Sequence, residues 1–153
     1  MPITELRGTT PTSERALERL EHDLGITLPA DYRAFLLRTN GGVPFPEDAY
    51  HHERYSTLVG LFYSVEHERL SFTIAQKRLQ LEGRMPTDLL AIASDHGSNQ
   101  ICIGIGDDNH GKVYFWMLAD EVRPGRTPDY SNVGLVADTF DEFLSLFYNA
   151  DEE

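Results

Sequence analysis

The chain has 153 residues, of which 41% are hydrophobic and 25% are charged, so its composition fits one folded domain with its own core and argues against disorder. Its 25 acidic and 13 basic residues give a net charge of −12, which disfavours a nucleic-acid partner and favours a basic protein partner. The single cysteine excludes an internal disulfide and a cysteine-rich zinc site.

The start of the chain and its apolar runs bear on where the protein works. The first eight residues lack the apolar core of a signal peptide, and no apolar run reaches the ~18 residues that a membrane span needs. We therefore expect a single domain over residues 1–153, soluble and cytoplasmic, without a membrane partner. Acidity is concentrated after position 106, where eleven acidic residues accompany three basic ones.

The N-terminal third predicts two helices followed by an irregular loop. The first helix covers residues 12–25, where leucines recur at helical spacing before Gly25. The second covers about 30–39 and begins after Pro29, whose missing N–H costs nothing at the start of a helix. Two prolines within residues 43–53 predict a loop there.

The middle of the chain predicts a strand, a helix and then three consecutive strands. The first strand covers 57–63, and the helix covers about 66–81. Three apolar segments separated by short turns then predict an antiparallel meander. The strands of this meander are 89–94, 100–106 and 112–118.

Alternation of side chains assigns the faces of the last two meander strands. The three isoleucines of the middle strand share one face, which we expect to be core. A five-residue connecting loop would place Ile103 opposite Phe115 and Gly104 opposite Tyr114, so that rings lie over small residues. The face with Tyr114 and Trp116 is either covered by another segment or partly exposed.

The C-terminal part predicts a loop, a short strand and a helix. Residues 120–132 are rich in proline, glycine and aspartate, which favour a loop, and 134–137 can add a strand. Thr139 and Glu142 match a capping box, in which the threonine caps the helix and the glutamate reaches back to it. Apolar periodicity predicts that this helix extends to about Tyr148.

The sequence GIGDDNHG, at residues 104–111, combines residue types found in phosphate, calcium and catalytic sites. A dinucleotide motif needs a third glycine and a following helix, whereas a strand is expected here. A calcium loop needs alternating ligands, whereas Asp107, Asp108 and Asn109 are consecutive. We interpret the segment as a turn between two strands.

No other pattern predicts a catalytic or metal site. No two histidines lie at i, i+4 on a helix, and His96 and His110 fall at opposite ends of the middle strand. Ser94, Asp95 and His96 are adjacent, whereas the members of a catalytic triad meet in space from separate segments. Cys102 is expected to be a buried, inert thiol. We expect no catalytic residue, no metal and no cofactor.

The order of several short segments is more informative than any one of them. They are a leucine-rich helix ending at Leu24-Gly25, LPADYRAFL at 28–36, NGG at 40–42, LLAIASD at 89–95, NQICI at 99–103, GKVYFW at 111–116 and FDEFL at 140–144. In this order they resemble the SUKH superfamily of SMI/KNR-like domains, found in yeast cell-wall-synthesis regulators and in many bacterial immunity proteins. The resemblance implies an α+β domain for binding other proteins, with a mainly antiparallel sheet, a central meander and about four helices packed against it.

Bacterial proteins of this type typically neutralise a cognate polymorphic or contact-dependent toxin, often a nuclease, without catalysis. We therefore expect an immunity protein, a monomer or weak homodimer, whose partner is a basic protein toxin. We expect the partner surface in acidic, irregular segments with aromatic anchors. The candidate residues are Glu47, Asp48, Tyr50, Asp107, Asp108, Tyr114, Trp116, Asp120 and Glu121.

Alternatives remain for the residues and for the whole protein. Each candidate acid can instead be an ordinary loop residue, and each aromatic can be core. The protein can instead be a regulatory interaction module without a toxin partner. A small hydrolase that uses acids and a histidine of residues 43–53 is the third possibility.

Overall fold

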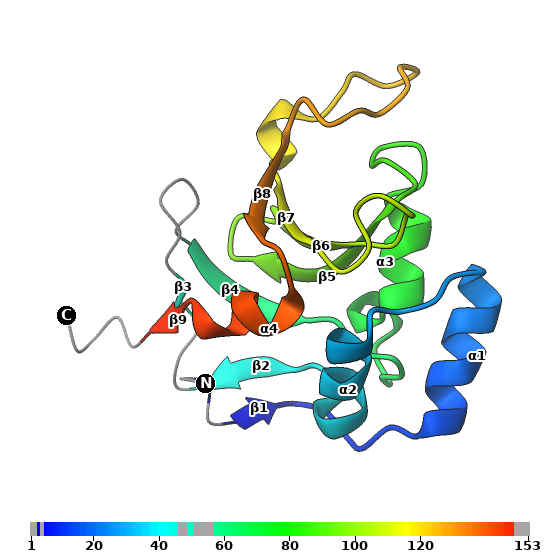
Figure 1. Ribbon diagram of the computed structural model, residues 1–153, viewed down its shortest axis with the longest axis vertical. Coiled ribbons are helices and arrows are strands. Elements are labelled where there is room, and N and C mark those ends of the chain that lie inside the picture. Colours follow the sequence, from blue (N-terminus) through cyan, green and yellow to red (C-terminus); the bar gives the residue numbers. More distant parts are fainter. Residues whose placement is uncertain (1–2, 4, 46–48, 51–56, 149–153) are drawn as a thin grey trace.

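The computed structural model describes residues 3, 5–45, 49–50 and 57–148 of the chain (Figure 1). The described helices are α1 (Glu14–Leu24), α2 (Ala30–Thr39), α3 (Ile74–Gln80) and α4 (Phe140–Ser145), with the 3-10 turns η1 (Leu70–Phe72) and η2 (Leu118–Asp120). The strands are β1 (Glu5–Arg7), β2 (Val43–Phe45), β3 (Ala49–Tyr50), β4 (Thr57–Phe62), β5 (Leu89–Asp95), β6 (Gln100–Gly104), β7 (Val113–Trp116), β8 (Val133–Ala137) and β9 (Phe147–Tyr148). None of the described helices is long and apolar enough to cross a bilayer.

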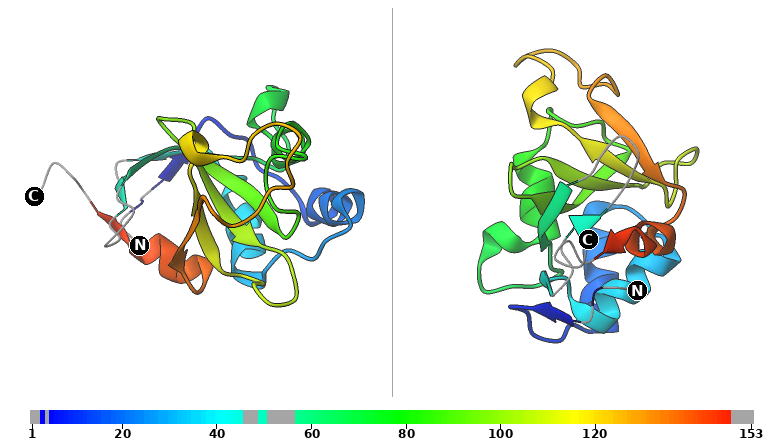
Figure 2. Two further views of the ribbon diagram at one scale, coloured as in Figure 1. Left: turned by 90° about the horizontal axis from the view of Figure 1, so that it is seen from above. Right: turned by 90° about the vertical axis from the view of Figure 1, so that its left-hand side faces the viewer.

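Seven of the described strands form one sheet in the order β8-β7-β6-β5-β4-β3-β9, and β1 and β2 form a separate two-stranded sheet. All neighbours in the large sheet are antiparallel. The predicted meander of β5, β6 and β7 is confirmed. Ile101 and Cys102 point to opposite faces of β6, and both are fully buried, so both faces of the sheet centre are covered. The fold is α+β, with helices packed on an antiparallel sheet (Figures 1 and 2).

The predicted helices α1 and α2 are confirmed, and their ends follow from local residues. The side chain of Ser13 accepts a hydrogen bond from Ala16 N at the start of α1. Gly25 ends this helix in the left-handed conformation, with φ of 66°. Asn40 ends α2 in the same conformation, with φ of 56°.

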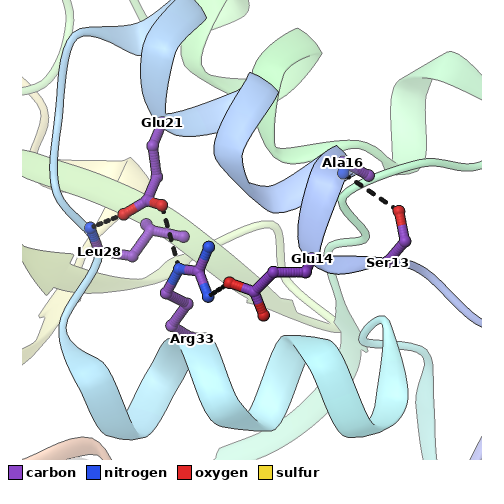
Figure 3. Close-up of polar contacts among 6 residues, drawn as sticks. All are labelled: Ser13, Glu14, Ala16, Glu21, Leu28 and Arg33. Atoms are coloured by element: carbon purple, nitrogen blue, oxygen red, sulfur yellow. Dashed lines mark hydrogen bonds and ion pairs between the residues drawn. The ribbon is translucent and has the colours of Figure 1, made fainter.

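A partly buried ion pair joins α1 to α2 (Figure 3). Arg33 of α2 donates from Nε to Glu21 Oε1 at 3.0 Å and from Nη1 to Glu14 Oε1. The second carboxylate oxygen of Glu21 accepts the backbone N–H of Leu28 at 2.9 Å, in the link between the helices. Since the side chain of Arg33 is 22% exposed and that of Glu21 is 18% exposed, the pair is shielded from water more than a surface pair.

Aromatic rings connect α2 and α4 to the sheet, and the two helices lie side by side (Figure 1). Phe140 of α4 packs edge-to-face on Phe35 of α2, with ring centroids 4.8 Å apart. Phe35 in turn contacts Phe62 of β4 at 5.2 Å. Such edge contacts add to the free energy gained by burying the rings. The rings of this cluster belong to Tyr32, Phe35, Phe62, Phe140, Phe143 and Phe147.

The register between β6 and β7 differs from the prediction by two residues. Ile103 lies opposite Val113, and Cys102 lies opposite Tyr114. The faces are nevertheless as predicted, because a shift of two residues preserves the alternation of side chains. The cause is the loop: the ladder closes where Gly104 N donates to Lys112 O at 2.8 Å, so that residues 105–111 form the turn.

Three further element predictions were wrong in part. Residues 43–53, expected to be a loop, contain β2 and β3. The helix predicted over 66–81 is split into η1 and α3, because Thr73 caps a new helix by accepting Gln76 N at 3.2 Å. The last helix ends at Ser145 rather than Tyr148, and the chain continues as β9, which pairs with β3.

Candidate functional site

Tyr130 lies in the segment between η2 and β8 and holds this segment to the opposite end of the meander. Its phenol donates to Asp88 Oδ1 at 2.7 Å and accepts from Asn109 Nδ2 at 3.0 Å. Burial, followed by the hydrogen bond and charge of Asp88, raises the pKa of the phenol. The tyrosine is therefore neutral at physiological pH and can keep donating to the carboxylate.

Tyr130 shares a small apolar surface with Tyr114, which it contacts, and Leu135, which lies opposite Tyr114 on the neighbouring strand. We call these three residues the tyrosine patch. The rings of Tyr114 and Tyr130 pack edge-to-face with centroids 6.0 Å apart. Leu135 of β8 lies opposite Tyr114 of β7, so their side chains share one face of the sheet. Tyr130 is 41% exposed and Leu135 is 45% exposed, so the patch is accessible to a partner.

Two carboxylates lie close to the tyrosine patch, those of Asp88 and Asp138. Burial and then the charges of Asp88 and Asp138 raise the pKa of Tyr114, so both carboxylates act on this ring. Asp107 and Asp108 are exposed and immediately precede Asn109, which binds Tyr130. The patch therefore combines accessible aromatic surface with a negative rim.

Asn109 connects the loop at 104–111 to this patch. Its side-chain oxygen accepts Gly106 N at 2.8 Å, and its amide nitrogen also donates to Asp88 O at 3.2 Å. His110 Nε2 lies 2.9 Å from Thr27 O, which ties the loop to the link between α1 and α2. The loop is thus a fixed turn, and its two exposed aspartates directly precede the asparagine that bonds to Tyr130.

The other candidate residues are distributed differently from the prediction. Trp116 is 0% exposed, so it offers no surface to a partner, and the indole belongs to the core. Glu121 forms two hydrogen bonds with Arg84, at 2.9 and 3.0 Å, which partly neutralise its charge. Asp120 is exposed at the end of η2. Glu47 and Asp48 lie outside the described residues, as does the side chain of Tyr50, whose backbone belongs to β3.

The surroundings of the described residues that could carry chemistry do not favour a catalytic or metal site. Cys102 is buried, its sulfur lies 3.7 Å from that of Met85, and burial raises the pKa of the thiol, which disfavours a nucleophilic thiolate. Among the described residues, no three His, Cys, Asp or Glu side chains are grouped so that they could hold a metal. The hydrolase hypothesis concerned residues 43–53, of which 46–48 and 51–53 lie outside the described part.

Sequence reasoning missed Tyr130, Leu135 and Asp88. Tyr130 lies in a loop without periodicity, and only the tertiary fold brings it to Asp88, 42 positions earlier. Leu135 fits the alternation of a strand, but alternation does not predict that β8 lies at the edge of the sheet or that the Leu135 side chain is exposed. The available signal was the lack of basic residues after position 126, which marks this part of the chain as an acidic surface.

The fold and the surface describe a small α+β domain with an accessible aromatic patch in an acidic surround. The sequence model of the SMI1 / KNR4 family (SUKH-1) matches residues 11–146, so the chain belongs to this family. Domains of this family occur in immunity-type proteins and are generally non-catalytic interaction modules. The chain is also similar to the SPbeta prophage-derived uncharacterized protein YokK of Bacillus subtilis (strain 168), with 28% identity over 147 residues, covering 84% of this chain and 70% of YokK.

Proposed function

We propose that the protein is an immunity protein, which binds a cognate basic protein toxin and blocks it without chemistry of its own. The observation that carries the proposal is the tyrosine patch with its rim of carboxylates. Tyrosine is, with tryptophan and arginine, enriched among the side chains that dominate the free energy of a protein interface. Family membership supports the proposal, since domains of this kind occur in immunity-type proteins.

The charge of the chain gives a physical reason for a basic partner. A toxin that acts on nucleic acid must approach phosphates and is commonly basic, so a chain of net charge −12 attracts it over a long range. Electrostatic attraction of this kind accelerates association and suppresses wrong partners. We expect the exposed Asp107, Asp108 and Asp138 to contribute to this attraction.

The same surface could serve a regulatory interaction module, and the partner decides between the two functions. The test first identifies a toxin domain encoded next to this chain's gene and then inactivates it by a substitution. Isothermal titration with the purified chain should give a stoichiometric complex whose affinity falls as the salt concentration rises. If no complex forms at low salt, the toxin assignment fails.

A further inference from the structure

β8 forms one edge of the seven-stranded sheet, and β7 is its only strand partner among the described residues (Figure 1). An edge strand presents backbone N–H and C=O groups that no neighbour satisfies, which makes it a template for another strand. Natural edges are commonly protected by charged residues or proline. The sequence of β8, Val-Gly-Leu-Val-Ala, contains neither.

The hydrogen-bond pattern identifies which backbone groups of β8 face outward. Met117 N donates to Asn132 O at 3.0 Å, so this pair is hydrogen-bonded. Hydrogen-bonded and non-bonded pairs alternate along an antiparallel ladder, which makes the pair of Tyr114 and Leu135 a non-bonded one. The N–H and C=O of Leu135 therefore point away from β7, toward the open edge.

The other side of β7 gives the same result. Gly104 N donates to Lys112 O at 2.8 Å, and counting two pairs along the ladder gives a hydrogen-bonded pair of Cys102 and Tyr114. The backbone groups of Tyr114 thus point toward β6 and leave Leu135 without a partner on β7. A register shift near Val136 ends the regular ladder, and the outward N–H of Val133 already donates to Tyr130 O at 3.1 Å. The groups available to another strand are therefore the C=O of Val133 and the N–H and C=O of Leu135.

We propose that the edge of β8 pairs, through Leu135, with a short extended segment of the toxin that carries basic residues on both sides. This strand would extend the sheet beyond β8 and lay its side chains against the tyrosine patch. Addition of a strand to an open edge is a common mode of recognition, in which the backbone gives affinity and the flanking side chains give specificity. The proposal rests on the proposed function, and it specifies the kind of segment that the toxin contributes: extended and flanked by basic residues.

Charge favours a toxin segment flanked by basic residues over a second copy of the chain as the strand that pairs with β8. Asp129 precedes β8 and Asp138 follows it, and both are exposed. Two copies paired edge to edge would bring these carboxylates together in a chain of net charge −12. A segment with Lys or Arg at its ends would instead place opposite charges at both ends of the ladder.

The test combines hydrogen exchange with substitutions at Leu135, using the inactivated toxin domain encoded beside the gene. Binding should slow exchange of the Leu135 amide at least tenfold. Leu135→Pro removes the outward N–H without removing a bond to β7, and it should weaken binding by about tenfold or more. Leu135→Lys should weaken binding similarly by repelling the basic segment, whereas Leu135→Glu should weaken it by less than about threefold.

Leu79→Lys is the matched control, because Leu79 is a 64% exposed leucine on α3 and should leave affinity unchanged. Melting temperatures show whether each variant is folded. The chain could neutralise the toxin while its Leu135 amide stays unprotected and all Leu135 variants keep their affinity. This result would overturn the strand pairing and leave the proposed function standing. A concentration-dependent dimer of the chain alone, abolished by Leu135→Lys, would assign the edge to a second copy and also overturn it. If the toxin domain does not bind the chain at all, the proposed function itself is wrong, and strand pairing need not be considered.

Discussion

Asn109 folds back over Gly104, and its carbonyl oxygen occupies the space that a β-carbon on Gly104 would need. This contact explains both the glycine and the register of the hairpin. The sequence interpretation had assigned Gly104 to making room for an aromatic ring on the next strand, and that was wrong. The neighbour is the loop itself, which continues to Tyr130 through the side chain of Asn109.

Gly104→Ala should lower the free energy of unfolding by about 2–3 kcal/mol, because the added methyl group meets backbone that cannot move without breaking the turn. Urea denaturation measures the change. Gly97→Ala is the control, since its added β-carbon would have only ordinary contacts of 3.5 Å with Asn99 and Asp95. Equal, small losses for both variants would show that the loop adapts and that Gly104 is not required.

Arg33→Ala should lower the free energy of unfolding by about 1–2 kcal/mol, because it leaves the shielded carboxylate of Glu21 without its cation. Arg19→Ala, at an exposed arginine of α1, should change the free energy little. Denaturation at low and high salt separates the two kinds of charge, since shielded pairs are less sensitive to ionic strength. Similar values for the two variants would contradict a stabilising link between α1 and α2.

High pH should destabilise the protein through Tyr63. Burial raises the pKa of this phenol to about 12, whereas an unfolded tyrosine has a pKa of about 10. The folded state holds the proton more tightly, so its contribution is complete below pH ~10 and is lost as the pH rises from about 10 to 12, at roughly 1 kcal/mol per pH unit.

Urea denaturation of wild type and Tyr63→Phe between pH 9 and pH 11 checks the Tyr63 contribution. The variant also loses a 2.6 Å hydrogen bond to Gln100 Oε1, so its stability at pH 9 is lower. The informative quantity is the slope against pH, which should be shallower in the variant. Parallel slopes would show that Tyr63 does not titrate differently in the folded and unfolded states.

Local patterns were sufficient for part of the fold and not for the surface. The bounds of α2 were predicted correctly because Pro29 and Asn40 mark its two ends. The hairpin register was missed because it depends on how Asn109 folds back onto Gly104 within the loop, which residue types and alternation do not specify. Of the three residues of the tyrosine patch, local sequence singled out only Tyr114, whereas Tyr130 is brought to it by the fold. Trp116 was proposed as an anchor because alternation alone does not distinguish a covered face from an open one.

Asp138→Lys should weaken toxin binding by about tenfold or more, because it reverses a charge beside the tyrosine patch. Glu18→Lys makes the same change in net charge on the exposed surface of α1 and should have an effect of less than about threefold. Titration calorimetry with the inactivated toxin domain compares them. Equal losses would indicate that net charge, rather than the position of Asp138, determines affinity.

Tyr130→Phe should loosen the attachment of residues 127–132 to the rest of the domain. The substitution removes the hydrogen bonds to Asp88 and Asn109 while it retains the ring. We expect a loss of about 1 kcal/mol in the free energy of unfolding and faster hydrogen exchange in residues 127–132. Unchanged exchange there would show that the bonds of Tyr130 do not hold the segment.

The most direct test of the immunity function is survival of cells that express the active toxin domain encoded beside the gene. The wild-type chain should protect these cells, and Glu18→Lys should protect them equally. The double variant Tyr130→Ala/Asp138→Lys, if it accumulates to wild-type levels, should fail to protect. Death of cells that contain the wild-type chain would contradict the immunity function, and full protection by the double variant would contradict the role of the tyrosine patch.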